Sequence, residues 1–454
     1  MESQTSIYSN KKYAYRILDN LSIELEINEN PYSLPLEDLF IMAARRNKKR
    51  SFLFVSKILG KHLPIIPSKG LLTGSLLAAQ YAAKTTGMEL SKEFNLQAEF
   101  AEENPNVPEA FIPSELSPVI IGFAETATAL GQAFFSAFKK ADYFHTTREM
   151  ISNEDPIITF EEEHSHATSH RCYISRNLLD NRREIVLVDD EMSTGKTAIN
   201  IIRSIQAEFP RDVYSVVSIL DWRSDEDVHK FKKLEDELGI NINCVSLLRG
   251  KFTISGHSPE SELNADHETF GIPEQRVKKH YVDQIRPVPS SRFHGAKLKE
   301  IPYAASSGRF GMDETARNLL DEILLDVAAK LSPMSQGKRV LCIGTGEFMY
   351  FPMKTAALMR GDVSYQSTTR SPIHIVNKEG YGARYGMAFP NPEDLEIQHY
   401  LYNVAPFQYE EVFIFFEREV PDEWLEPMLK EFQRTGIQTI NLVFFHSRMV
   451  KNNE

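Results

Sequence analysis

One stretch constrains the fold of this chain more than any other: residues 185–197, which read IVLVDDEMSTGKT. Four apolar residues, three of them β-branched, form a short continuous run typical of a buried parallel strand. The run ends at two adjacent carboxylates, Asp189 and Asp190. After a small hydroxylic loop, residues 198–202 resume with the apolar spacing of a helix. The pattern therefore predicts a strand, a loop and a helix N-terminus within an α/β sheet.

The loop between this strand and helix has the residue types that bind a phosphate group. At a helix N-terminus, unpaired N–H groups and the positive end of the helix dipole point at an anion. Hydroxyl side chains add donors, and glycine lets the backbone approach closely. The loop residues are Ser193, Thr194, Gly195, Lys196 and Thr197. Because the two aspartates before them can accept hydrogen bonds from a pair of sugar hydroxyls, the stretch predicts a site for ribose 5-phosphate.

Two other interpretations of the loop compete with this one. The triplet at 195–197 suggests a triphosphate-binding P-loop, but that motif needs a glycine where Asp190 stands. A carboxylate at that place would repel a triphosphate. The plainer alternative is an acidic turn before an ordinary helix capped by Ser193 or Thr194. It requires the apolar run, the acidic pair and the S-T-G-x-T loop to coincide by chance, so we favour the sugar-phosphate site.

Composition limits the class of protein. A length of 454 residues predicts two domains, and 42% hydrophobic with 25% charged residues is typical of a soluble globular protein. No apolar stretch approaches the roughly 18 residues that cross a bilayer. The three cysteines lack metal-ligand spacing and the first residues lack an apolar signal core, so we expect reduced thiols and a cytoplasmic location. The net charge of −12 disfavours a nucleic-acid surface.

A second strand, loop and helix precedes the acidic pair. Residues 117–134 predict a strand, a turn that starts at Gly122 and a helix of small residues. Residues 141–150 predict another strand, which ends in Thr146, Thr147 and Arg148. An arginine at a strand end suits anion binding because its guanidinium offers a fork of donors.

Three further features keep more than one interpretation. Residues 34–62 predict a helix, a basic turn and a second helix or strand. The basic cluster in this segment is either a solvated helix end or a patch that binds a polyanion. It consists of Arg45, Arg46, Lys48, Lys49 and Arg50. Trp222, at the end of another predicted strand, either stacks on a planar base or packs in the core. The histidines of residues 151–174 lack zinc-ligand spacing, and we expect no metal site among them; they are His164, His166 and His170.

The C-terminal part of the chain repeats the pattern of the first part. IGFAE ends at Glu125 and IGTGE ends at Glu347, and in both cases the sequence Thr-Thr-Arg begins 21 residues later. An apolar strand ending in acid follows each time, at Asp190 and at Glu417. The dinucleotide-binding fingerprint fails in the second copy because its third glycine position is Met349. We therefore expect a second α/β unit that is a degenerate relative of the first. It lacks the hydroxylic loop but keeps a second anion site, formed by Thr369, Arg370 and Ser371.

Taken together, these segments resemble a bacterial family found with tellurium-resistance and stress gene clusters. Its members join a type I phosphoribosyltransferase domain to a domain named for a Thr-Arg-Ser-Pro motif, which stands here at residues 369–372. The resemblance implies a mostly parallel sheet flanked by helices, followed by a second α/β domain. The implied boundaries are 1–285 for the first domain, with an N-terminal extension of about 1–63, then a linker at 286–300 and a TRSP domain at 301–454. A cut within 287–295 is expected to leave an N-terminal piece that still binds substrate.

The resemblance also implies a substrate, phosphoribosyl pyrophosphate (PRPP). In that family the acidic pair binds the ribose 2- and 3-hydroxyls and the hydroxylic loop binds the 5-phosphate. The diphosphate would lie against the turn after Gly122 and against Arg148; the turn residues are Glu125, Thr126, Ala127 and Thr128. Residues 151–174 stand where the family keeps a mobile loop that closes over the substrate. The catalytic residues would be Asp189, Asp190 and Arg148.

The implied activity is transfer of a 5-phosphoribosyl group from PRPP, with Mg²⁺, to a nitrogenous base or base-like acceptor, with release of pyrophosphate. Ser193 stands where purine-salvage members of the wider superfamily have an aspartate, which makes simple hypoxanthine or guanine salvage less favoured. The alternative is a non-catalytic protein that senses PRPP or a nucleotide. The expected partners are PRPP and a nucleobase-like small molecule. No membrane is expected, nucleic acid is disfavoured, and a homodimer is compatible with the resemblance.

Overall fold

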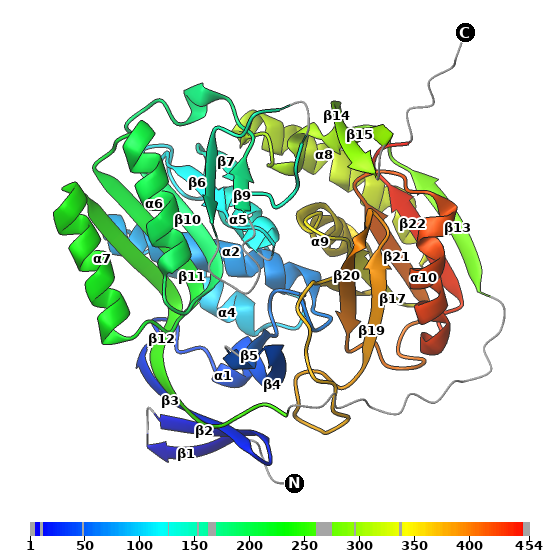
Figure 1. Ribbon diagram of the computed structural model, residues 1–454, viewed down its shortest axis with the longest axis horizontal. Coiled ribbons are helices and arrows are strands. Elements are labelled where there is room, and N and C mark those ends of the chain that lie inside the picture. The colour runs from blue at the N-terminus through cyan, green and yellow to red at the C-terminus, as the bar shows by residue number, and fades with distance from the viewer. Residues whose placement is uncertain are drawn as a thin grey trace.

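The computed structural model describes residues 5–9, 12–47, 50–125, 127–151, 154–161, 169–259, 275–294, 297–335 and 338–447. They form two α/β units that lie side by side in Figure 1, the first coloured blue to green and the second yellow to red. A nine-stranded sheet organises the first unit and a five-stranded sheet the second. Within the described residues, no helix is both long enough and apolar enough to cross a membrane.

The first sheet has a parallel centre and antiparallel edges. Its strand order is β1-β2-β3-β12-β11-β10-β6-β7-β16, and the strands from β12 to β7 are parallel to their neighbours. The parallel strands are β6 (Val119–Gly122), β7 (Asp142–His145), β10 (Ile185–Met192), β11 (Val213–Asp221) and β12 (Asn241–Gly256). The antiparallel strands are β1 (Thr5–Ser9), β2 (Lys12–Leu18), β3 (Leu21–Glu29) and β16 (Met312–Asp313).

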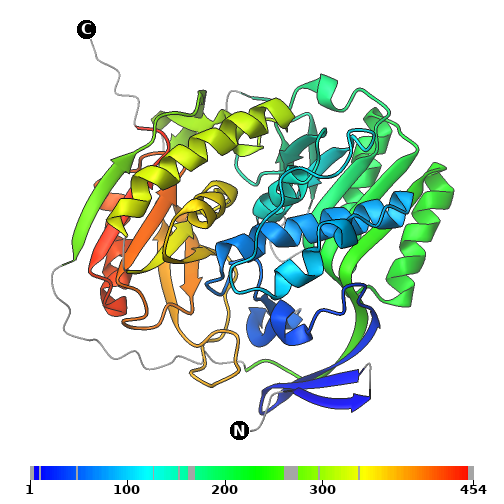
Figure 2. The same cartoon turned by 180° about the vertical axis from the view of Figure 1, so that it is seen from behind.

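Helices cover both faces of this parallel centre, which explains the continuous apolar runs in its strands. Successive residues of β10 point to opposite faces: Val186 and Val188 belong to the cluster that contains α2 and α5, whereas Ile185 and Leu187 pack with α6 and α7. The helices are α2 (Pro67–Thr86), α3 (Leu90–Glu93), α4 (Leu96–Ala101), α5 (Ala127–Ser136), α6 (Lys196–Glu208) and α7 (Asp225–Leu238). Figure 2 shows α2 crossing the back of the molecule toward the second unit.

The second sheet is entirely parallel, with the strand order β13-β22-β21-β17-β18. Its strands are β13 (Arg276–Tyr281), β17 (Arg339–Gly344), β18 (Asp362–Ser367), β21 (Glu411–Phe416) and β22 (Thr439–Phe444). The helices of this unit are α8 (Glu314–Leu331), α9 (Tyr350–Leu358) and α10 (Asp422–Phe432). Four short 3-10 turns complete the described chain, at Arg176–Leu178, Ala305–Ser307, Ser332–Met334 and Gln433–Thr435.

The two units share one arrangement, as the sequence repeat predicts. The order β11-β10-β6-β7 in the first sheet corresponds to β22-β21-β17-β18 in the second, with α5 and α9 at equivalent places. Each unit also contains a two-stranded hairpin, which lies between β7 and β10 in the first unit and between β18 and β21 in the second. The hairpins are β8 (Ile158–Glu161) with β9 (Ser169–Cys172), and β19 (Gly386–Asn391) with β20 (Asp394–Tyr402).

The units also exchange edge strands. The fifth strand of the second sheet, β13, precedes α8 and β17 in the chain, and it pairs with β22 along residues 276–281. In the opposite direction, β16 crosses back to the first sheet and pairs with β7. One continuous hydrophobic cluster contains Leu76 of α2 together with Phe351 of α9 and Phe413 of β21. The two sheets therefore belong to one interlocked molecule.

Residues 34–62 were predicted as a helix, a basic turn and a second helix or strand. Their described part forms a four-residue helix, α1 (Leu36–Leu39), and then a β-hairpin, so the first segment is mostly strand and the second adopts the strand alternative. The hairpin strands are β4 (Phe40–Asn47) and β5 (Arg50–Ser56). Phe52 and Phe54 of β5 pack edge-on to each other and against Phe252 of β12. This distant partner, which no local pattern reveals, stabilises strand over helix. The hairpin also contacts the second unit, where the Gly382 N–H donates to the Met42 carbonyl at 2.9 Å.

Within residues 286–300, predicted as a linker, 287–294 and 297–300 lie in two paired strands, β14 (Pro287–His294) and β15 (Lys297–Ala304). The prolines that suggested a linker are compatible with this structure because each strand of a two-stranded ribbon has a free edge, where a missing N–H costs no ladder bond. Pro289 lies opposite Pro302 in the register.

Candidate active site

A cavity of about 1580 Å³ lies where the first sheet, the β4–β5 hairpin and a loop of the second unit meet. The carboxyl ends of parallel strands β6, β10 and β11 open into it, which is where open α/β sheets bind ligands. Most of the predicted site residues line it: Glu125, Arg148, Asp189, Asp190, Ser193, Thr194, Gly195, Lys196, Thr197, Trp222, Thr369, Arg370 and Ser371. The fold thus brings together residues as distant in the sequence as Glu125 and Ser371.

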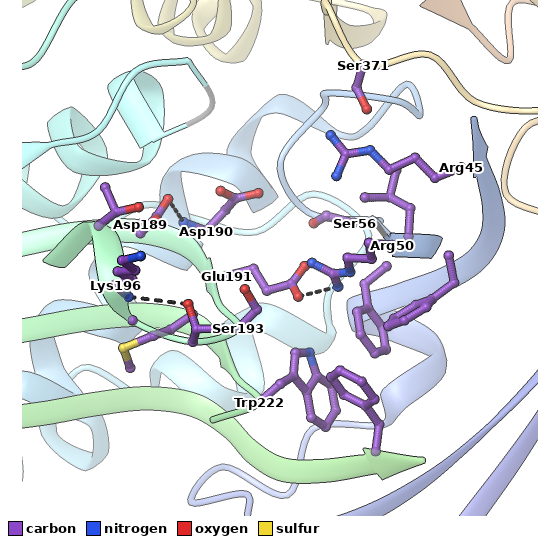
Figure 3. Close-up of a pocket in the computed structure, with 18 of the residues that line it drawn as sticks. Arg45, Arg50, Ser56, Asp189, Asp190, Glu191, Ser193, Lys196, Trp222 and Ser371 are labelled. Atoms are coloured by element: carbon purple, nitrogen blue, oxygen red, sulfur yellow. Dashed lines mark hydrogen bonds and ion pairs between the residues drawn. The ribbon is translucent and has the colours of Figure 1, made fainter. Parts of the chain in front are cut away.

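The acidic pair lies inside β10, whose pairing with β11 continues to Met192. The strand therefore extends beyond its apolar run. The Asp190 N–H donates to the Asp189 Oδ1 carboxylate oxygen at 2.9 Å. Figure 3 shows both carboxylates on the cavity wall near Lys196. Asp189 and Asp190 are both only partly buried, so their oxygens can be reached from the cavity.

The hydroxylic loop leads directly into α6, as predicted. Gly195 is the residue before the helix and has φ 73°, a left-handed conformation that glycine adopts without strain. A Cβ at this position would lie 2.4 Å from the Phe231 ring, so a side chain there would force the loop or the ring to move. The Lys196 N–H donates to Thr194 Oγ1 at 3.4 Å. Lys196, Thr197 and Ala198 of the first turn of α6 line the cavity, so the positive end of the helix dipole lies at the cavity wall.

The turn after β6 brings a second acidic group to the same edge. Glu125 is buried, its Oε2 atom lies 3.6 Å from the Arg148 guanidinium, and its Oε1 atom has no hydrogen-bond partner among the described residues. The peptide bond between Ala124 and Glu125 is cis. The Ala124 N–H donates to Thr146 Oγ1 at 2.9 Å. Glu125 and Arg148 therefore face the cavity from two adjacent parallel strands.

Two predicted residues of that turn lie elsewhere, and a third is outside the described residues. Ala127 and Thr128 are buried in the first turn of α5 and do not line the cavity. The Thr128 hydroxyl donates to backbone oxygens of Glu125 and Glu347, at 3.0 and 3.2 Å. Thr126 lies outside the described residues.

The histidine cluster is only partly described. His164 and His166 lie outside the described residues. His170 is buried in β9, where its Nδ1 atom is 2.8 Å from Thr146 Oγ1 and its ring stacks on Phe160. His170 thus supports the turn that carries Arg148.

Glu347 of the second unit reaches the Thr-Thr-Arg turn of the first, which the sequence did not predict. The Thr147 hydroxyl donates to Glu347 Oε2 at 2.6 Å, and the Arg148 N–H donates to Oε1 at 2.9 Å. Burial would raise the pKa of Glu347, but Arg309 and the bond from Thr147 hold this pKa below its usual value. The carboxylate is therefore ionised and fixes the backbone from which Arg148 projects.

A buried ionic cluster fills the second unit at the place that corresponds to the acidic pair. Gly122 pairs with Val188, and Gly344 pairs with Phe415, so Glu417 has the register position of Asp190. Glu417 lies 3.0 Å from the Arg309 guanidinium instead of facing a ligand cavity. The remaining members of the cluster are Arg418, Glu149, Glu347 and Glu393. In the sequence, this cluster is indicated only by the charged pair Glu417-Arg418, which directly follows an apolar strand.

The β4–β5 hairpin supplies a basic and aromatic wall. Arg50 forms an ion pair with Glu191 at 2.5 Å, drawn in Figure 3. Trp222 stacks on Phe54, with ring centroids 4.7 Å apart and planes at 16°, and is 3% exposed. One face of the indole is thus already covered, which favours the packing interpretation of Trp222. Arg45 and Arg46 line the cavity from β4, whereas Lys48 and Lys49 lie outside the described residues.

Comparison with known proteins agrees with this geometry. Residues 39–251 match the family described as phosphoribosyl transferase, and residues 306–432 match the family described as the TRSP domain C terminus to PRTase_2. No curated protein matches the chain.

Solved structures with similarity to the chain include the adenine phosphoribosyltransferase of Trypanosoma brucei, at 14% identity over 34% of this chain and 62% of that chain, with a TM-score of 0.21. This chain thus spans less than two thirds of that enzyme. The Saccharomyces cerevisiae adenine phosphoribosyltransferase has 16% identity over 36% and 81% of the two chains, with a TM-score of 0.21. A Staphylococcus aureus hypoxanthine phosphoribosyltransferase has 10% identity over 36% and 69%, with a TM-score of 0.20.

The two family matches follow one another, cover most of the chain and fall on the two α/β units. The second match contains the sequence Thr-Arg-Ser-Pro at residues 369–372, on the cavity wall. This chain therefore belongs to the family in which a phosphoribosyl transferase domain is followed by a TRSP domain.

Proposed function

We propose that the protein transfers the 5-phosphoribosyl group of PRPP to a nitrogenous, base-like acceptor and releases pyrophosphate. The observation that carries the proposal is the meeting of three groups at one cavity edge: the acidic pair of β10, the hydroxylic loop before α6, and the Glu125–Arg148 turn. These are complementary, in order, to sugar hydroxyls, a phosphate monoester and a diphosphate.

Each group has a distinct task in this reaction. Asp189 and Asp190 accept hydrogen bonds from the ribose 2- and 3-hydroxyls and so fix the sugar. The N–H groups and hydroxyls of residues 193–197 hold the 5-phosphate. As the C1–diphosphate bond breaks and positive charge develops on the sugar, Arg148 stabilises the negative charge that collects on the leaving diphosphate. The acceptor nitrogen then forms the new bond to C1.

The carboxylates of the site fit a magnesium complex of PRPP, because Mg²⁺ prefers oxygen ligands and is usually bound through substrate phosphates with one or two carboxylates. Glu125, with a buried Oε1 atom that has no partner among the described residues, and Asp190 are the candidates to hold it. When bound, Mg²⁺ would offset the charge of the diphosphate.

The acceptor would enter between the acidic pair and the β4–β5 hairpin. Phe54 and Trp222 give this side an apolar floor, and Ser193 takes the place of the aspartate that purine-salvage enzymes of the superfamily have. We therefore expect an acceptor other than hypoxanthine or guanine.

Calorimetry with the full-length protein, PRPP and Mg²⁺ tests the proposal, together with an assay of pyrophosphate release across a panel of nitrogenous bases. We expect saturable PRPP binding and release of pyrophosphate with at least one acceptor. Failure to bind PRPP at millimolar concentration would contradict it. Binding without release for any base would instead favour a protein that senses PRPP.

A further inference from the structure

The Thr-Thr-Arg turn occurs twice, on one scaffold. In the first unit Thr146 Oγ1 accepts from the Ala124 N–H at 2.9 Å and lies 2.8 Å from His170 Nδ1. In the second unit Thr368 Oγ1 accepts from the Gly346 N–H at 3.1 Å and lies 3.1 Å from the Nδ1 atom of His399. Each threonine thus ties the end of one parallel strand to the glutamate-containing turn of its neighbour.

The next residues correspond as well. Thr147 bridges to the backbone of Arg171, and Thr369 bridges to that of Tyr400. The hydroxyl of each threonine accepts an N–H from the residue two positions later, at 3.1 Å in both units. Residues 146–149 and 368–371 therefore have the same hydrogen-bonded conformation, with Arg148 and Arg370 at equivalent positions.

The first turn already binds a carboxylate, and this shows what the scaffold recognises. Glu347 receives the Thr147 hydroxyl on one oxygen and the Arg148 N–H on the other. This two-point arrangement is how a hydroxyl and an adjacent N–H bind a planar anion with both donors satisfied. The anion comes from the protein itself, so these two donors of the first turn are already engaged.

The second turn has the donors without the carboxylate. Within the described part of the chain, no carboxylate is hydrogen-bonded to Thr369, Arg370 or Ser371. Thr369 Oγ1 accepts a bond from the Ser371 N–H, which leaves its own proton to donate. Ser371 stands where the first turn has Glu149, so a hydroxyl replaces a negative charge. The Ser371 hydroxyl is buried and has no hydrogen-bond partner among the described residues.

The charge around the second turn also suits an anion. Arg370, Arg45 and Arg46 line the same part of the cavity, and Figure 3 shows the Ser371 hydroxyl directed toward Arg45. His399 contributes no charge of its own, because burial and the nearby Arg370 lower its pKa to about 3 and keep its ring neutral. A backbone hydrogen bond connects β4 to the Thr369–Ser371 turn: the Arg46 N–H donates to the Pro372 carbonyl at 3.2 Å.

The second turn opens into the cavity of the acidic pair. That cavity, about 1580 Å³, exceeds the roughly 300–1,000 Å³ that a small-molecule ligand usually occupies. It therefore has room beyond a PRPP molecule and a simple base. The acidic pair and the Thr369–Ser371 turn both line it, so one ligand can contact both.

We propose that the turn Thr369-Arg370-Ser371 binds an anionic group, a carboxylate or a phosphate monoester, of the phosphoribosyl acceptor. That the bound molecule is the phosphoribosyl acceptor rests on the proposed function. That the turn binds an anion rests only on the geometry of the turn. The TRSP unit then selects the substrate, while the first unit carries PRPP.

The test uses the full-length protein saturated with ribose 5-phosphate, which competes for the hydroxylic loop of α6. Thermal shift titrations with benzoate, phenyl phosphate and neutral benzamide measure binding of each anion and of an uncharged analogue of similar shape. We expect one or both anions to stabilise the wild type and benzamide not to do so. The stronger of the two anions identifies the acceptor's group as carboxylate or phosphate.

Variants locate the effect. Arg370→Gln should weaken anion binding at least tenfold, and Ser371→Ala, which removes one small donor, should weaken it severalfold. The control Arg360→Gln, an exposed arginine of the same unit outside the cavity, should behave as the wild type.

Equal shifts in wild type and both cavity variants, or no shift of the wild type with either anion, would overturn the proposal. PRPP calorimetry on the same proteins without ribose 5-phosphate reports the proposed function separately. Normal PRPP binding without an anion effect would remove only the second site. An anion effect without PRPP binding would remove only the proposed transferase.

Discussion

Asp189 and Asp190 are neighbours, yet they differ in what already engages their carboxylates. The Asp189 side chain accepts the N–H of Asp190. Asp190 is therefore the cleaner probe of sugar recognition, since replacing it leaves that local bond in place.

Asp190→Asn keeps the shape of the side chain but removes the charge that accepts sugar hydroxyl bonds. We expect PRPP binding to weaken by about 1.5–3 kcal/mol, the usual contribution of hydrogen bonds to a charged group. Calorimetry with PRPP and Mg²⁺ measures this. Affinity within a factor of two of the wild type would show that the acidic pair does not contact the sugar.

Glu393 makes stability depend on pH. It is buried beside Arg418, Glu149, Glu417 and Arg309, and burial raises its pKa from the usual 4.5 to about 7. A carboxyl whose folded pKa is raised binds protons more tightly in the folded state. Its stabilising contribution is therefore complete below about pH 4.5 and is lost as the pH rises through about 7.

Glu393→Gln mimics the protonated side chain at every pH. We expect this variant to match the wild type near pH 5 and to exceed its free energy of unfolding by about 1–3 kcal/mol at pH 8, given 1.36 kcal/mol per pKa unit. Denaturant unfolding at the two pH values provides the measurement. A difference independent of pH would mean that Arg418 keeps Glu393 ionised throughout.

At the scale of elements, the loop between β10 and α6 depends on one glycine. Gly195→Ala would place a Cβ 2.4 Å from the Phe231 ring in a left-handed backbone conformation. We expect it to weaken PRPP binding at least tenfold through displacement of the loop, and to lower stability by about 1–3 kcal/mol.

Gly239 offers the matched control, since it has φ 66° but a Cβ added there would have no other atom within 4 Å. Gly239→Ala should carry only the backbone cost of about 1–2 kcal/mol and leave PRPP affinity unchanged. Calorimetry and thermal unfolding of the two variants separate loop geometry from stability. Equal PRPP affinity in both would show that the loop does not hold the 5-phosphate.

The elements that sequence reasoning predicted well are those whose signal is local. The apolar runs of β6, β10 and β21, each ending at a turn or an acid, were visible because both faces of these strands are buried. The repeated Thr-Thr-Arg motif gave the second unit. The β4–β5 hairpin was predicted only in part: β4 was expected to be helical, and β5 was left open between helix and strand, because its choice depends on the contact of Phe52 and Phe54 with Phe252, about 200 residues away.

The candidate site divides in the same way. The acidic pair and the hydroxylic loop are contiguous in sequence and could be read from it. Glu347 could not be placed on the Arg148 turn, and the cavity could not be assigned to both units, because those contacts depend on how two sheets dock. No local sequence pattern indicates how the two sheets pack against each other.

At the scale of the whole molecule, strand exchange changes what a truncation should do. A piece ending near residue 295 would lose β16 from its own sheet and would keep β13 without its partner β22. The apolar faces of α2 and α5 that pack on α9 would also be exposed. The expectation of an independent N-terminal piece therefore does not follow from this architecture.

We predict that residues 1–295 produced alone are aggregated or largely unfolded, and that coexpression with residues 296–454 gives a soluble complex that binds PRPP. Size-exclusion chromatography, circular dichroism and calorimetry distinguish the cases. The uncut chain is the control. A monomeric, folded 1–295 fragment with full PRPP affinity would show that the exchanged strands contribute little.

The position of β13 also bears on how the chain is made. This strand ends at Tyr281, but β22 ends only at Phe444, roughly 160 residues later. At a synthesis rate of about 5–20 residues per second, β22 is completed about 10–30 s after β13, and β13 remains unpaired during that time. During that interval its free edge, and the half-covered face of the first sheet, are surfaces that a nascent-chain chaperone could bind. Vectorial synthesis thus postpones both the completed sheets and the shared cavity until the last strand has emerged.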